Sequence, residues 1–241
     1  MVLSTAAQIY SDDASLADWT RNYLRQHQGR LATDLDLVLK TLPKQCHVLD
    51  VGAAPFVTSA ALQTLGFKVE AIDLEPDRFA SVIAALRLKA HGCDIEKEAL
   101  PLADQSVDAV LFNELFEHLR INPIFTLSEV FRVLKPGGHL LLSTPNLRSF
   151  RGIRNLILHD QGHAVSAGVY RQYAKLQSLG HMGHVREYTR RETVSFLKQI
   201  GFVSETIYFR GGYGRGLVGL AEKLAPSMRP FFSVIARRPE P

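Results

Sequence analysis

The residues with the most distinctive chemistry stand in the stretch VLDVGAAPF, residues 48–56. A short apolar run ends there in Asp50, and small residues follow it. Small residues let the backbone approach a ligand, and the helix expected next offers its positive N-terminus. The Asp50 carboxylate would disfavour a pyrophosphate and attract a ligand that carries ammonium and sulfonium groups, so the charge favours a cationic cofactor. The residues predicted to contact it in this turn are Asp50, Gly52, Ala53 and Ala54.

Two further acidic residues stand at the expected ends of the next strands. Asp73 ends the strand expected at 69–72 and is followed by Leu74. Asp94 and Ile95 follow the weaker strand pattern at 90–93. The carboxyl ends of neighbouring parallel strands are where such sheets bind their ligands, so these carboxylates are candidates for the same site as Asp50. An exposed turn carboxylate is the alternative for each of the two.

Alternating strands and helices must position these residues. Strands are expected at 48–49, 69–72, 90–93, 107–112, 139–143, 203–209 and 232–236, with helical patterns at 58–65, 79–86, 123–134, 189–200 and 217–224. Thr189 and Glu192 form a capping box for the fourth of these helices. The alternation predicts an α/β fold, namely a doubly wound, mostly parallel seven-stranded sheet with helices on both faces and an inserted cap.

The length of 241 residues predicts a single domain over 1–241. Its expected parts are 1–45 (two N-terminal helices), 46–145 (cofactor-binding core), 146–188 (substrate cap) and 189–241 (C-terminal part of the core). The start of the chain lacks the basic residues of a signal peptide, and no apolar run reaches the ~18 residues of a membrane span. A cytoplasmic protein without a transmembrane segment is therefore expected.

Several motifs resemble those of class I, or Rossmann-like, S-adenosylmethionine-dependent methyltransferases. Asp50 and Gly52 match the family's first motif, Asp-x-Gly-x-Gly-x-Gly, in which Ala54 and Phe56 here replace the later glycines. The stretches FNELFEHL (112–119) and LKPGG (134–138) resemble the small-molecule, methyltransferase type 11/12-like group. The resemblance covers residues 46–146 well and 184–209 fairly.

This resemblance implies S-adenosyl-L-methionine as the cofactor and methyl transfer as the activity. It implies that Asp73 holds both ribose hydroxyls and that Leu74, next to it, also belongs to the cofactor site. It also implies that Asp94 faces the adenine amino group beside Ile95, and that Asn113, after the fourth strand, belongs to the cofactor site.

A candidate catalytic pair stands just beyond that fourth strand. Glu117 and His118 stand three and four residues after Glu114, a spacing that brings these side chains to one side if the turn is helical, and His118 is the predicted general base. A hydrogen-bonded structural histidine is an equal alternative. His181 and His184, with Glu187 nearby, have no established metal-ligand spacing, and no metal is expected.

Positive charge gathers in the second half of the chain. Residues 1–145 hold 13 Lys and Arg against 18 Asp and Glu, whereas residues 146–241 hold 15 against 6. Arginine forks pair with phosphate and carboxylate oxygens, so a small anionic acceptor is predicted, such as a nucleotide-linked or lipid-linked sugar. Its predicted contacts are Arg148, Arg151, Tyr170, His184 and Tyr188. A solvated basic surface over buried aromatic residues is the alternative.

Other functions stay open at this point. An RNA or protein methyltransferase could use the same basic cap, but the chain has no recognition module or lysine-rich tail, so nucleic acid is not the expected partner. Ala54 and Phe56 replace glycines of the family's first motif, so a cofactor-binding protein without catalytic activity is a further alternative. Nicotinamide-dependent oxidoreduction is disfavoured by Asp50 and the missing Gly-x-Gly-x-x-Gly. A homodimer is compatible with the sequence.

Overall fold

The computed structural model describes residues 8–166, 168–179, 183–212 and 216–241. The chain divides into two compact units. The first unit comprises Met1–Leu111 and Arg132–His139, and the second comprises Phe112–Phe131 and Leu140–Pro241. The single domain expected over residues 1–241 stays a prediction.

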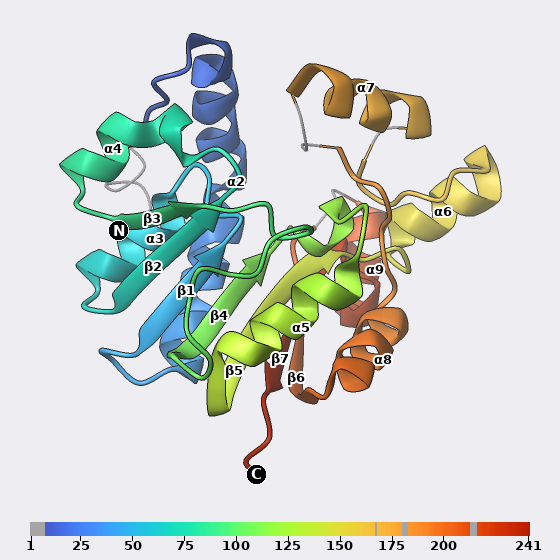
Figure 1. The fold of residues 1–241 in the computed structure, drawn as a ribbon. Helices are drawn as coiled ribbons and strands as arrows, with labels where there is room; N and C mark the ends of the chain where they lie inside the picture. The colour runs from blue at the N-terminus through green and yellow to red at the C-terminus, as the bar shows by residue number, and fades with distance from the viewer. Residues whose placement is uncertain (1–7, 167, 180–182, 213–215) are drawn as a thin grey trace. The chain divides into compact units, whose positions relative to one another are not determined.

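Across the described ranges, the strands form a seven-stranded sheet in the order β3-β2-β1-β4-β5-β7-β6 (Figure 1). The strands are β1 (His47–Val51), β2 (Lys68–Asp73), β3 (Lys89–Gly92), β4 (Val107–Asn113), β5 (Leu134–Pro145), β6 (Val203–Arg210) and β7 (Phe231–Arg237). β1 runs parallel to β2 and β4, and β2 runs parallel to β3, whereas β6 and β7 are antiparallel. The predicted fold class, a doubly wound and mostly parallel sheet, is confirmed. Its strand order reverses between β1 and β4, the position where such sheets bind ligands.

The helices between and around the strands are α2 (Ala14–Thr41), α3 (Val57–Thr64), η1 (Pro76–Phe79), α4 (Ala80–Ala85), η2 (Phe116–His118), α5 (Pro123–Val133), α6 (Phe150–His159), α7 (Val169–Leu179), α8 (Arg190–Ile200), α9 (Leu217–Leu224) and η3 (Pro226–Met228). Five of them, α3, α4, α5, α8 and α9, lie where helical patterns were predicted. Asn122 caps α5, because its side-chain oxygen accepts a hydrogen bond from Phe125 N at 3.1 Å. The apolar run of β4 is fully buried, as expected of a central parallel strand.

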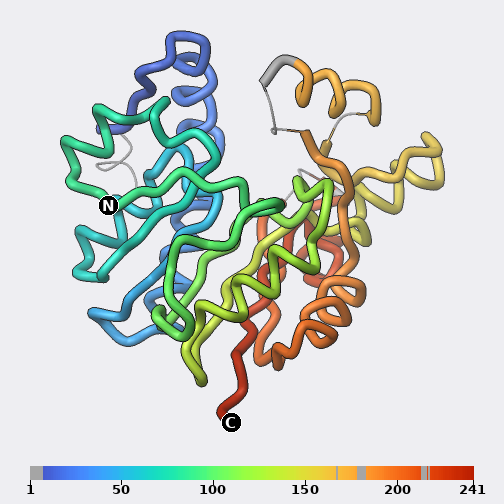
Figure 2. The backbone as a smooth tube through the Cα atoms, viewed as in Figure 1, coloured from blue at the N-terminus to red at the C-terminus, as the bar shows by residue number. Residues whose placement is uncertain are grey.

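The N-terminal segment forms one continuous helix, α2, where two were predicted (Figure 2). Leu24, Leu31 and Val38 are all buried at seven-residue spacing, so a single apolar stripe runs along the helix. Gly29 lies within α2, and a glycine in a helix costs about 1 kcal/mol relative to alanine without ending the helix. The two-helix prediction was therefore wrong.

Residues 146–188, predicted as a substrate cap, contain the helices α6 and α7. Ser149 caps α6, since its hydroxyl accepts a hydrogen bond from Gly152 N at 3.0 Å. Arg148 precedes this cap. The three-residue spacing of Arg148, Arg151 and Arg154 predicts that they share one face of a helix, but this is wrong for Arg148, because the helix begins only at Phe150.

Helix α8 begins with the predicted capping box. The Thr189 hydroxyl accepts from Glu192 N at 3.3 Å, and the Glu192 carboxylate accepts from Thr189 N at 2.8 Å. We expect Thr189→Ala to lower the free energy of unfolding by about 1 kcal/mol, because a helical N–H group loses its acceptor. Urea unfolding followed by circular dichroism measures this change. Thr189→Ser keeps the hydroxyl and should resemble the wild type, so an equal loss in both variants would contradict the capping role.

Within the described residues, no helix has the length and apolar character that a bilayer crossing requires. The cytoplasmic location stays a prediction.

Candidate functional site

The turn after β1 is held against the end of β2 within the first unit. Gly52 has a φ of +70°, a conformation that L side chains rarely adopt, so the turn requires glycine here. Gly52 N and Ala53 N both donate to Ile72 O, at 2.8 and 3.0 Å. The small residues of the turn therefore lie at the carboxyl end of β2, which is where the sequence placed the cofactor.

Asp50 is a buried carboxyl group in β1, only 4% exposed. The Ser59 hydroxyl donates to its Oδ2 at 2.6 Å. Burial, and to a smaller extent the carboxyl groups of Asp34 and Asp73, raise the pKa of Asp50 to about 7 against the lowering effect of the Ser59 hydrogen bond. Near neutral pH the group is thus divided between its two protonation states, and a cation beside it would favour the ionised one.

Asp73 is the last residue of β2, and its side chain is hydrogen-bonded to the turn of residues 52–54. Its Oδ2 accepts a hydrogen bond from Ala54 N at 2.9 Å, and Glu75 N lies 3.4 Å from its Oδ1. The side chain is half-buried, as is that of the neighbouring Leu74. The structure therefore brings together Asp73 and the Gly52–Ala54 turn, as predicted from the two strand ends.

Phe56 stands where the resembled motif has its third glycine. Its φ is +67°, which explains why glycine is favoured at this position. The ring is fully buried and meets Phe79 edge-on, with ring centroids 5.6 Å apart. Leu16 and Ala60 belong to the same cluster. Phe56 is thus a core residue of the first unit.

Asp94 and Ile95 lie in the loop after β3 and are half-buried. Both Asp94 oxygens have local partners, since Lys97 Nζ donates to Oδ2 at 2.7 Å and Glu96 N donates to Oδ1 at 3.2 Å. An adenine amino group that bonded to Asp94 would have to share the carboxylate with Lys97 or displace the lysine side chain. The predicted role of Asp94 toward adenine stays a prediction.

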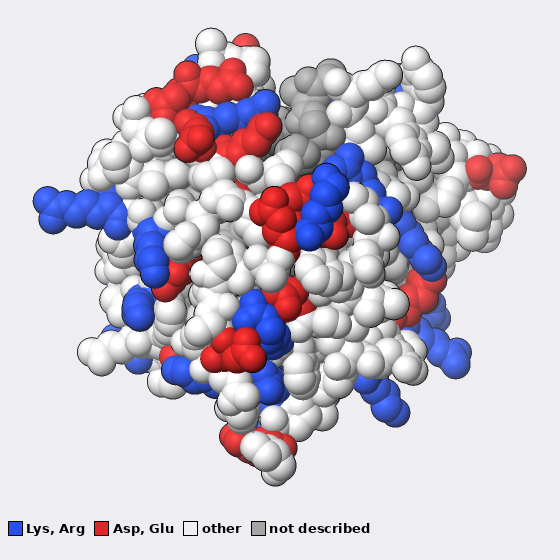
Figure 3. Space-filling view, in the orientation of Figure 1, with Lys and Arg blue, Asp and Glu red and all other residues white. Residues whose placement is uncertain are grey.

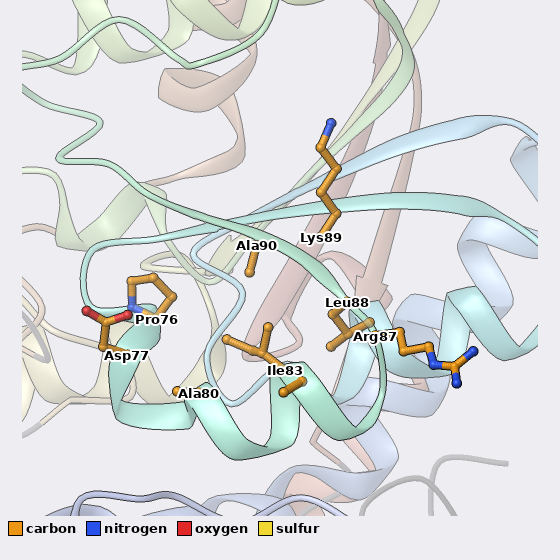
Figure 4. Close-up of a pocket in the computed structure, with 9 residues that line it drawn as sticks. Pro76, Asp77, Ala80, Ile83, Arg87, Leu88, Lys89 and Ala90 are labelled. Atoms are coloured by element: carbon orange, nitrogen blue, oxygen red, sulfur yellow. The ribbon is translucent and has the colours of Figure 1, made fainter.

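A cavity of about 490 Å³ in the first unit lies elsewhere, between β3 and the helices η1 and α4 (Figure 4). Pro76, Ile83, Leu88 and Ala90 give it an apolar wall, and the Lys89 side chain points away from it (Figure 4). None of the residues predicted to bind the cofactor lines this cavity.

In the second unit, the turn after β4 holds a buried ion pair that sequence analysis did not find. Glu114 Oε1 accepts from Arg210 Nη2 at 3.1 Å and from the Ser143 hydroxyl at 3.0 Å. The pair is almost fully buried. Arg210 stands 96 residues away at the end of β6, so no local pattern could have linked it to Glu114. Asn113, predicted for the cofactor, is the half-buried last residue of β4.

The predicted catalytic pair lies in the short helix η2. Glu117 is fully buried, and its Oε2 accepts from the Thr144 hydroxyl at 2.9 Å. His118 Nδ1 lies 2.9 Å from Gly183 O, and its ring meets that of His184 edge-on at 4.8 Å. The structure thus adds His184, predicted for the acceptor, to the Glu117 and His118 pair. The base role of His118 stays a prediction.

Two further residues near His184 are buried. The ring of Tyr188, predicted to bind the acceptor, stacks on Phe116 with centroids 4.2 Å apart. Glu187 accepts hydrogen bonds from three consecutive backbone N–H groups, those of residues 164–166. Burial alone would raise the pKa of Glu187, but hydrogen bonds from His184, the Ser166 hydroxyl and Ala164 N lower it to about 2. Glu187 is therefore an anion that anchors this loop.

A second cavity, of about 640 Å³, lies within the second unit next to α6 and α7. Arg151 and Tyr170, both predicted to contact the acceptor, line it together with Arg171. Arg148 is exposed and does not line it. On the face shown in Figure 3, Lys and Arg side chains are interspersed with Asp and Glu and do not form a continuous basic surface. Arg151 and Arg171 give the lining of this cavity two positive charges.

The fold is that of the Rossmann-like methyltransferases. An S-adenosylmethionine-dependent methyltransferase from Thermotoga maritima matches it with a TM-score of 0.62 at 17% identity, over 93% of this chain and 97% of that one. The 1,6-didemethyltoxoflavin-N1-methyltransferase of Burkholderia thailandensis, solved with 1,6-didemethyltoxoflavin and S-adenosylhomocysteine, gives 0.58 at 17% identity, over 99% and 89%.

Residues 23–206 match the methyltransferase-domain family, and the chain belongs to that family. A ubiquinone biosynthesis O-methyltransferase of Xanthomonas campestris is 37% identical over 106 residues, which are 41% of this chain and 43% of that protein. An uncharacterized methyltransferase of a Mycobacterium species is 32% identical over 136 residues, 54% and 52% of the two chains. The chain thus spans about half the length of the curated relatives it matches.

Proposed function

We propose that this chain binds S-adenosyl-L-methionine and transfers its methyl group to a small anionic acceptor. The observation that carries the cofactor part is that Asp50 and Asp73 lie near the carboxyl ends of the neighbouring strands β1 and β2, with the Asp73 carboxylate bonded to the turn that begins at Gly52. Two carboxyl groups beside a turn of small residues suit an adenosyl ligand that carries positive charge. The family of the chain supports the same cofactor.

Methyl transfer from a sulfonium is an in-line displacement, in which the acceptor atom bonds to the methyl carbon as the carbon–sulfur bond breaks. The enzyme mainly aligns acceptor, methyl and sulfur, and such placement supplies ~7–11 kcal/mol. A positioned base adds ~10²–10⁴ in rate. Loss of a base should therefore slow the reaction without abolishing it.

The acceptor class follows from the cavity next to α6 and α7. Arg151 and Arg171 contribute two guanidinium groups to its lining, and Tyr170 contributes an exposed ring. Guanidinium groups pair with phosphate and carboxylate oxygens in fork geometry, and an aromatic ring can pack against a sugar or an acyl chain. A phosphorylated or carboxylated small molecule, including a nucleotide-linked or lipid-linked sugar, fits this lining.

Removing one arginine of this cavity should weaken acceptor binding. We expect Arg151→Ala and Arg171→Ala each to raise KM for the anionic acceptor roughly tenfold, because each deletes a charge-assisted hydrogen bond of about 1.5 kcal/mol. The dissociation constant for S-adenosylmethionine should not change. The exposed Arg190 on α8 offers a charge-matched control in Arg190→Ala.

The measurement follows transfer of a labelled methyl group to phosphorylated and carboxylated sugars, nucleotide sugars and their neutral counterparts. Turnover restricted to the anionic compounds is expected. Equal turnover of the neutral counterparts would contradict the acceptor class. Methylation of RNA or protein that falls steeply with rising salt concentration would indicate a macromolecular acceptor in place of a small anionic one. Cofactor binding without any transfer would indicate a protein that has lost catalysis.

A further inference from the structure

Three potential metal ligands from distant parts of the sequence meet inside the second unit. Glu117 and His118 come from η2, and His184 comes from the segment before α8. One ligand atom from each, a carboxylate oxygen and two imidazole nitrogens, lies within 4.8 Å of the other two. The backbone holds them there, because Val185 N donates to Glu117 O at 2.8 Å.

The hydrogen bonds of both imidazoles define which nitrogen can bind an ion. Gly183 O, 2.9 Å from His118 Nδ1, is a carbonyl and can only accept, so His118 carries its hydrogen on Nδ1. His184 Nδ1 lies 3.1 Å from Glu187 Oε1. The Glu187 carboxylate already accepts from backbone N–H groups of residues 164–166, so it is an acceptor toward His184 as well. In the neutral form of each ring, the lone pair is therefore on Nε2.

This arrangement is the one that metal-ligating histidines show. A histidine that binds a metal through one nitrogen almost always donates its other N–H to a carboxylate or a backbone carbonyl, which orients the ring. Here one histidine uses a carbonyl and the other a carboxylate. Glu187 is itself fully buried and fastened by several donors, so the position of His184 is well defined.

The geometry points to a binding site for one divalent first-row transition-metal ion, of the Zn²⁺ class, formed by Glu117, His118 and His184 with Glu187 as the positioning residue. Two imidazoles and one carboxylate suit such ions, whereas Mg²⁺ and Ca²⁺ prefer oxygen ligands throughout. In a tetrahedral site with bonds of about 2.0–2.2 Å, ligand atoms lie roughly 3.5 Å from one another, so the three side chains, whose ligand atoms lie within 4.8 Å of one another here, move closer together when the ion binds.

Electrostatics favours the same ion. Glu117 is completely buried, and an ionised carboxylate in such a place is costly unless a positive charge compensates it. Three protein ligands leave at least one coordination position for water or for an oxygen atom of another ligand. The site thus gives His118 and Glu117 the role of ligands instead of the base role predicted from the sequence.

Cobalt tests this site without cofactor or acceptor, so the result does not depend on the proposed methyl transfer. The full chain, without an affinity tag and stripped by a chelator, is titrated with Co²⁺ and then with Zn²⁺. We expect one equivalent of Co²⁺ to produce visible d–d absorption that Zn²⁺ removes. His184→Asn should abolish this signal, and Glu187→Gln should weaken Co²⁺ binding about 10–100-fold. His159→Asn, at an exposed histidine of the same unit, should bind like the wild type.

Absence of one-equivalent binding to the wild type would overturn the site, and so would binding by His184→Asn with wild-type affinity. Circular dichroism shows whether each variant is folded. Should His184→Asn fail to fold, Glu187→Gln decides, because unchanged Co²⁺ affinity in that variant contradicts the proposed geometry. In addition, Zn²⁺ should raise the melting temperatures of the wild type and of His159→Asn, raise that of Glu187→Gln by less, and leave that of His184→Asn unchanged.

Discussion

Asp50→Asn is expected to raise the free energy of unfolding at about pH 8 by about 4 kcal/mol and to remove a large pH dependence. The pKa of Asp50 is about 7 in the folded protein, against an ordinary value of 3.8, mainly because the carboxyl group is buried. The difference corresponds to about 4 kcal/mol. Asparagine keeps the shape of the neutral acid and an oxygen that accepts from Ser59, but it has no proton to lose.

The direction of the pH dependence follows from the fact that the unfolded chain releases the Asp50 proton at a lower pH than the folded chain. Below about pH 4 both the folded and the unfolded chains hold the Asp50 proton, and Asp50 does not lower stability. As the pH rises from about 4 to about 7, the unfolded chain ionises first, so stability falls through this window and stays lower above it. At neutral pH the buried Asp50 therefore lowers the free energy of unfolding. Residues kept for ligand binding often lower stability in this way.

Urea unfolding between about pH 4 and pH 8 measures this difference. The wild type should lose stability as the pH rises, and the curve of Asp50→Asn should lie above it by a gap that widens up to about pH 7. The exposed Asp77 on η1 provides a control, since Asp77→Asn should follow the wild type. Parallel curves for Asp50→Asn and the wild type would contradict the buried, proton-holding state of Asp50.

Asp73→Asn should weaken binding of S-adenosylmethionine by about 2–4 kcal/mol, roughly 30- to 900-fold in the dissociation constant. The proposed function places two ribose hydroxyls on this carboxylate, and charge-assisted hydrogen bonds lose much of their strength when the charge is removed. The asparagine oxygen can still accept from Ala54 N, so the turn should keep its place.

Calorimetric titration with S-adenosylmethionine gives the two dissociation constants, and the melting temperature shows whether Asp73→Asn is folded. Asp77→Asn, four residues along the chain, should bind like the wild type. A dissociation constant for Asp73→Asn within about threefold of the wild type would mean that Asp73 only fastens the turn.

The strands and their ends could be predicted because their signals are local. The residues near the ends of β1 and β2, Asp50 and Gly52 for β1 and Asp73 for β2, differ abruptly in polarity or size from the apolar residues before them. A register of parallel strands then places these ends together without further information. The capping box of α8 was equally local.

The features that could not be predicted depend on contacts between distant residues. α2 continues past Gly29 because buried leucines on both sides share one stripe, which the residue types alone did not reveal. The pairing of Glu114 with Arg210 and the meeting of His118 with His184 join residues 96 and 66 positions apart. His181, considered beside His184 in the sequence, lies outside the described residues.

A crystal structure with S-adenosylhomocysteine tests the central claim most directly. The Asp73 carboxylate should contact both ribose hydroxyls, with the amino-acid part of the ligand at the turn of residues 52–54. An adenosyl ligand seated instead in the cavity beside Pro76 and Ala90, or an Asp73 side chain turned away from the sugar, would contradict the proposed cofactor site.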